Sequence, residues 1–171
     1  MTTGTDDHQD APGGTAGRVR QIPVPSAARA RSTLARVDYE DAFLVETGPR
    51  QNRTGERWAR AALEDTPMST RRALSMAWLA LGLRLGSTRS DRFVLGWHLR
   101  RVTEGFALLG ASGRLGLSGE LLFATEQDRL LFATFVQLDN PVARAVWAAI
   151  ARRHRHVVRQ LLEQASFAPS K

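Results

Sequence analysis

The chain contains no cysteine, so it can form neither disulfide bonds nor thiolate metal sites, and it has no cysteine nucleophile. Long apolar segments are missing too. The longest, residues 73–85, is interrupted by Ser75, Gly82 and Arg84 and falls short of the roughly 20 residues of a membrane-spanning helix. The N-terminal residues lack the apolar core of a secretory signal. We therefore expect a soluble, cytoplasmic protein without a membrane span.

Lysine is almost absent, because Lys171 is the only lysine among 24 basic residues and all the others are arginine. The net charge of +7 and the pI near 11.3 would suit binding to nucleic acid. Most arginines, however, are spread along the chain among acidic residues. The one dense cluster contains Arg152, Arg153, Arg155 and Arg159. We interpret it as a solvated basic face, which makes nucleic acid an unlikely partner, and a basic module that binds protein or nucleic acid is the alternative.

The chain has 171 residues, of which 43% are hydrophobic, enough for one domain with its own core. Residues 1–34 are dominated by glycine, threonine, aspartate, proline and serine. They carry too few apolar side chains to offset the entropy lost on ordering. We expect a disordered or extended tail at 1–34 and a folded domain at 35–167.

The folded part opens with a predicted strand at 37–46, in which Tyr39, Phe43 and Val45 recur with period two. Asp38, Glu40 and Asp41 interrupt the apolar pattern. A ligand or metal site would be one use of this acidic trio. Polar positions at the start or edge of a strand are the simpler interpretation.

Two helices are predicted next, at 54–64 and 69–85, separated by Pro67. The second is apolar almost all round, which is typical of a buried helix. Met76, Trp78 and Leu81 of this helix are assigned to the core, with the wall of a ligand cavity as the alternative.

Four consecutive strands are then predicted at 95–102, 106–112, 117–125 and 129–138. Their connections are short and polar, which indicates an antiparallel meander. Glu120 is a single carboxylate within an otherwise apolar strand. We expect it to face solvent or to pair with an arginine such as Arg100.

A long helix at 139–167 ends the chain, with Asn140 as its N-cap and Pro141 in its first turn. Most positions on one side of this helix are apolar, and they include Trp147 and Leu161. His154 is the exception, because it falls inside this apolar face. Either a buried partner or a ligand would satisfy the imidazole there.

The order β-α-α-β-β-β-β-α resembles the helix-grip fold of the START and polyketide-cyclase-like superfamily, and more closely a family of uncharacterised bacterial proteins within it. The likeness covers about residues 35–165. The residues that carry it are Val37-Asp38-Tyr39-x-Asp41-x-Phe43, Leu108-Leu109-Gly110, Thr134-Phe135-Val136, Asn140-Pro141-x-Ala143-Arg144-x-x-Trp147 and His154-Arg155-x-x-Val158. The resemblance implies an α+β fold in which a curved antiparallel sheet wraps around the C-terminal helix.

Such a fold predicts a hydrophobic cavity between the sheet and the C-terminal helix, and therefore a protein that binds a lipid- or polyketide-like molecule without turnover. The expected ligand-binding residues are His154, Trp147, Thr134, Phe135, Trp97 and Leu161. A cyclase- or aromatase-like enzyme with His154 as general acid/base is the alternative. No cofactor is expected, and no metal, because His154 and His156 point to nearly opposite sides of the helix.

Overall fold

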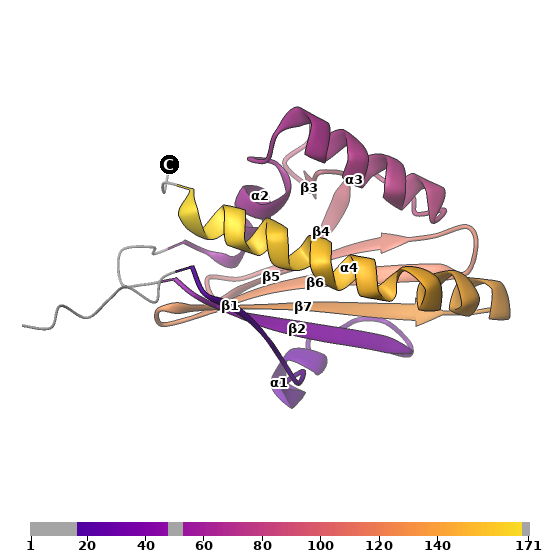
Figure 1. Ribbon diagram of the computed structural model, residues 1–171, viewed down its shortest axis with the longest axis horizontal. Coiled ribbons are helices and arrows are strands. Elements are labelled where there is room, and N and C mark those ends of the chain that lie inside the picture. Colours follow the sequence, from indigo (N-terminus) through magenta and orange to yellow (C-terminus); the bar gives the residue numbers. More distant parts are fainter. Residues whose placement is uncertain (1–16, 48–52, 169–171) are drawn as a thin grey trace, which may run out of the picture.

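The computed structural model describes residues 17–47 and 53–168, which form an α+β arrangement of one antiparallel sheet with helices packed against it (Figure 1). The strands are β1 Val19–Ile22, β2 Tyr39–Glu46, β3 Phe93–Val94, β4 Trp97–Val102, β5 Phe106–Ser112, β6 Leu117–Glu126 and β7 Arg129–Leu138. The helices are α1 Ser26–Arg29, α2 Gly55–Leu63, α3 Met68–Ala80 and α4 Pro141–Phe167. The seven strands lie in the order β1-β2-β7-β6-β5-β4-β3.

The predicted meander and C-terminal helix are confirmed as β4 to β7 and α4. The sheet has seven strands where the sequence predicted five, because β1 and β3 were missed. β1 lies within the segment expected to be a tail. It pairs with β2 through Val19 opposite Val45, so the part of 1–34 that the structure describes belongs to the folded domain. Residues 1–16 lie outside the description.

The side chains of β2 alternate between two buried faces of the sheet. Tyr39, Asp41, Phe43 and Val45 point to the side covered by α2 and α4, which we call the α4 face. The opposite face is covered by the segment that runs from Ile22 through α1 to Val37. Because both faces are covered, the central strands β6 and β7 are buried almost throughout.

Helix α3 differs from the expectation of a buried helix, since none of its residues is buried. Met76 and Leu79 are 66% and 52% exposed. α2 and α4 already lie over the α4 face, and α3 lies outside them (Figure 1). Its Trp78 packs on Trp97 of β4 with ring centroids 5.5 Å apart. The core assignment of α3 was therefore wrong, although Trp78 does reach the core.

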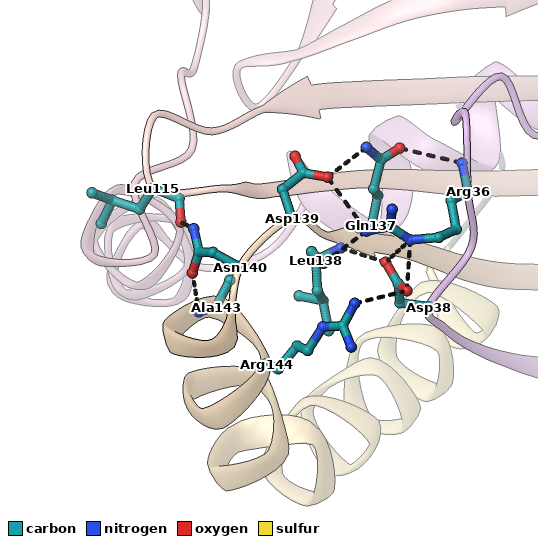
Figure 2. Close-up of polar contacts among 9 residues, drawn as sticks. All are labelled: Arg36, Asp38, Leu115, Gln137, Leu138, Asp139, Asn140, Ala143 and Arg144. Carbon is teal, nitrogen blue, oxygen red and sulfur yellow. Dashed lines mark hydrogen bonds and ion pairs between the residues drawn. The ribbon is translucent and has the colours of Figure 1, made fainter.

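A set of polar contacts fixes the start of α4 (Figure 2). Asn140 Oδ1 accepts a hydrogen bond from the Ala143 amide at 2.8 Å, and its Nδ2 donates to the Leu115 carbonyl at 3.0 Å. Asp38 accepts from the Leu138 amide at 2.8 Å, and Arg144 lies 3.8 Å from its carboxylate. These bonds set the direction in which α4 leaves β7, and with it the place of His154.

Glu120 is fully buried on the opposite face, where it forms the ion pair with Arg100 that the sequence analysis named as one possibility. Arg100 Nη1 lies 2.8 Å from Glu120 Oε1. Ser32 Oγ donates to Glu120 at 2.6 Å, and the Thr33 amide and hydroxyl also donate to it. Arg100 reaches Glu120 across Gly110, where a Cβ would overlap its guanidinium. This carboxylate thus holds the segment after α1 against the sheet.

We predict that Glu120→Ala lowers the free energy of unfolding by about 3–5 kcal/mol, because it leaves the partly buried Arg100 guanidinium and several donors without their acceptor. Urea unfolding followed by circular dichroism measures this change. Glu126→Gln, at an exposed position of the same strand, is the control and should change stability by less than about 0.5 kcal/mol. Equal effects of the two variants would contradict the role given to Glu120.

Candidate functional site

The two polar residues at apolar-facing positions of β2 and α4 meet each other. Asp41, 4% exposed, points from β2 to the α4 face, and His154 points down from α4. His154 Nε2 lies 3.3 Å from Asp41 Oδ2 and 3.2 Å from Thr134 Oγ1 of β7. Asp41 and Thr134 are directly opposite in the β2–β7 register, which places both under the same turn of α4.

Tyr39 and Arg155 extend this contact. The Tyr39 hydroxyl donates to Asp41 Oδ2 at 2.6 Å and accepts from Arg155 Nη1 at 3.1 Å. Arg159 turns the same way, with Nη1 3.5 Å from the Val19 carbonyl. The predicted arginine cluster is therefore divided. Arg155 and Arg159 contact β2 and β1, and Arg152, Arg153 and Arg159 are exposed.

Trp147 completes the group, nearly two helical turns before His154. Its ring centroid lies 5.0 Å from that of Tyr39 and 5.2 Å from that of His154. We call these six residues the Asp41 cluster. Its members are Tyr39, Asp41, Thr134, Trp147, His154 and Arg155. It combines a carboxylate, an imidazole and two hydroxyls with the aromatic rings of Tyr39 and Trp147.

The charges of the Asp41 cluster are mutually compensated. Burial alone would raise the pKa of Asp41, but hydrogen bonds from His154, Tyr39 and Thr134 and electrostatic attraction to the His154 ring hold that pKa below its ordinary value. Burial, and then the bond to Asp41, raise the pKa of Tyr39. The Tyr39 contact, and more weakly the charge of Asp41, raise the pKa of Arg155. Asp41 is therefore ionised and Tyr39 is neutral at neutral pH.

Two polar atoms of the Asp41 cluster are buried without a hydrogen-bond partner in the described part of the chain. They are Asp41 Oδ1, an acceptor, and Trp147 Nε1, a donor. The other two such atoms lie away from the cluster: Trp97 Nε1, under α3, and Arg71 Nε, on α3 itself. Leaving a buried polar group unpaired costs about 1–3 kcal/mol. A ligand that pairs both atoms of the cluster would remove that cost.

The structure brings together three of the six predicted ligand-binding residues, His154, Trp147 and Thr134. Trp97 and Leu161 lie on the same α4 face, but Trp97 is under α3 and Leu161 is nearly two turns beyond His154. Phe135 is misplaced in the prediction, because it points to the opposite face and packs with Ala28, Leu108 and other residues there. It therefore cannot line a cavity beneath α4.

Sequence reasoning missed Asp41, Tyr39 and Arg155. The signal was present in the alternation of β2, since Asp41 has the same parity as Tyr39, Phe43 and Val45 and must share their buried face. A buried carboxylate on one surface and an imidazole on the facing surface are each other's natural partners. The acidic trio was interpreted as edge residues instead.

A surface hollow of about 720 Å³ borders Asp41 where β1 leaves β2, and it is lined by Gln21, Ile22, Pro23, Val24, Arg29, Glu40 and Asp41. Another, of about 440 Å³, is lined by Thr47, Arg53, Thr54, Trp58, Glu104, Thr125, Gln127 and Arg129. Neither lies between the sheet and α4. Within 17–47 and 53–168, no three histidine, aspartate or glutamate side chains gather as a metal site would require. No helix there is long and apolar enough to cross a membrane.

We predict that Asp41→Asn destabilises the protein at pH 7 by about 1–3 kcal/mol. Because the pKa of Asp41 is lowered by folding, its ionised form stabilises the fold above the unfolded pKa of about 3.9, and this stabilisation is lost as the pH falls through the lowered value. The difference between the variant and the parent should therefore shrink below about pH 4. Urea unfolding from pH 7 to pH 3 checks it, with Asp91→Asn as an exposed control. A difference independent of pH would contradict the ionised pair.

Comparison of the chain with family models, curated proteins and solved structures found no match, so what the protein does has to be inferred from the geometry of the Asp41 cluster.

Proposed function

We propose that the protein has a helix-grip fold of the START and polyketide-cyclase-like kind and binds a hydrophobic small molecule on its α4 face without turning it over. The observation that supports the proposal is that Asp41 Oδ1 and Trp147 Nε1 of the Asp41 cluster are buried without a hydrogen-bond partner in the described part of the chain. A core that served stability alone would be expected to pair or omit such groups. A ligand supplies the missing partners.

Apolar surface is available next to these atoms. Ile150 and Val157 of α4 pack against the core of the α4 face but remain partly exposed. Val146 of α4 is 40% exposed. An exposed apolar surface beside a few converging polar groups is the usual composition of a small-molecule site.

His154 is the member of the Asp41 cluster through which a ligand reaches the buried atoms. Its side chain is 20% exposed, whereas that of Asp41 is 2% exposed. Thr134 and Asp41 hold the ring from the sheet, and Trp147 packs beside it. In this proposal His154, Thr134 and Trp147 remain ligand-binding residues, as predicted from the sequence, and Asp41 joins them.

We predict that native mass spectrometry of the protein incubated with a lipid extract shows a noncovalent adduct, and that the same extract raises the melting temperature. His154→Gln should weaken binding of the retained molecule about tenfold, because one charge-assisted contact is lost. His156→Gln, exposed on the same helix, is the matched control and should bind normally. If no adduct forms and the melting temperature does not change, the proposal is wrong.

A second candidate is an enzyme of the cyclase or aromatase kind, which one observation favours. Ionised Asp41 has only lone pairs to offer, so its contact with His154 is favourable when Nε2 carries the proton. Neutral His154 then presents Nδ1 as a base, and Nδ1 has no hydrogen bond to any residue that the structure describes. A carboxylate that orients an imidazole in this way is the arrangement of acid/base catalysis.

For this second candidate we predict that His154→Gln removes turnover of a cyclising substrate by about 100-fold or more while binding persists within about tenfold. Product formation by mass spectrometry and affinity by calorimetry are measured on the same samples. Full turnover in the variant would exclude His154 as the acid/base. Binding without turnover in the parent protein favours the first proposal, a protein that binds the molecule without turning it over.

A further inference from the structure

The two unpaired atoms of the Asp41 cluster restrict the polar group that a ligand can bring. Asp41 and Trp147 are 4% and 7% exposed, so water reaches neither freely. Both side chains contact the same two rings. Tyr39 donates a hydrogen bond to Asp41 and packs on Trp147, and His154 also contacts both residues. A single small polar group of a ligand bound between these shared neighbours would meet an acceptor, Asp41 Oδ1, and a donor, Trp147 Nε1.

Comparison of the common polar groups leaves a hydroxyl as the best fit. A ketone or ester oxygen only accepts, so it would leave Asp41 Oδ1 unpaired. An ammonium only donates, so it would leave the Trp147 indole unpaired. A carboxylate only accepts and would also face the negative charge of Asp41. A hydroxyl donates and accepts through one atom.

The charge balance of the site also disfavours an ammonium. Asp41 already faces Arg155, through Tyr39, and His154. The attraction between Asp41 and Arg155 is part of what raises the pKa of the arginine. The carboxylate therefore has nearby compensating charge and does not need a cation from the ligand, and a second cation would be repelled by Arg155.

We infer that the ligand of the α4 face is an apolar alcohol, whose hydroxyl donates to Asp41 Oδ1 and accepts from Trp147 Nε1. This inference rests on the proposed binding of a hydrophobic molecule on that face. It adds the class of head group, and it assigns to Asp41 and Trp147 the selection of that group.

Four probes with chains of similar length separate the head groups: 1-decanol, 2-decanone, decylamine and decanoate. Affinities are measured by isothermal titration calorimetry at pH 7, below the concentrations at which the probes aggregate. We expect 1-decanol to bind about tenfold or more tighter than 2-decanone, because the ketone leaves a buried carboxylate oxygen unpaired. Decylamine and decanoate should bind more weakly than 1-decanol.

Variants of the two selecting residues test the assignment. Asp41→Asn places an amide N–H where an acceptor was, so it should reverse the preference and favour 2-decanone over 1-decanol. Trp147→Phe keeps an aromatic ring and removes the donor, so it should weaken 1-decanol about fivefold to tenfold. Trp97→Phe removes an unpaired indole N–H outside the Asp41 cluster and should leave the ratio of the two affinities unchanged. Circular dichroism shows which variants are folded, and Trp147→Phe still tests the inference if Asp41→Asn is not.

The outcomes separate the two proposals. If none of the four probes and no component of the lipid extract binds, the proposed function fails and the inference fails with it. If the probes bind with equal affinity, or if decylamine or 2-decanone binds tightest, the proposed function stands and the inference that the ligand is an alcohol is wrong. A parent preference for 1-decanol that Trp147→Phe leaves intact also overturns the assignment.

Discussion

The contact between Asp41 and His154 is the constraint around which the α4 face is arranged. It joins a central part of β2 to the middle of α4, and it places two charged or polar groups where the surrounding surfaces are apolar. Such a buried contact is stable only if the other hydrogen-bonding positions of the two side chains are also paired. Here Tyr39 and Thr134 pair most of them. One acceptor of the pair, Asp41 Oδ1, has no hydrogen-bond partner in the described part of the chain, and the proposed function rests on it.

Much of the structure of the α4 face could be predicted from patterns in the sequence. The period-two runs predicted β2 and the meander, Asn140 and Pro141 predicted the start of α4, and the helical wheel placed His154 on its buried side. The partner of His154 was missed because the acidic residues 38–41 were treated as one group. Adjacent strand residues point to opposite faces, so Glu40 and Asp41 have different surroundings and had to be judged separately.

The elements that the sequence predicted wrongly have one cause in common, which cannot be recognised from the local sequence. β1 carries only two apolar residues, and it is a strand because the edge of β2 pairs with it. α3 is apolar nearly all round, and it stays exposed because α2 and α4 already occupy the centre of the sheet. Phe135 lies in a strand that is apolar on both sides, so composition could not show which side meets α4. In each case the competition between elements for one surface decided the outcome.

The outermost strands have a consequence for how copies of the protein meet. An unpaired sheet edge offers free backbone groups to a neighbouring chain and can seed aggregation. Here one edge is the four residues of β1 and the other the two residues of β3, and a register shift interrupts β4 between Leu99 and Arg101. Short and irregular borders of this kind give another sheet little length on which to add, and they protect the long, apolar strands between them.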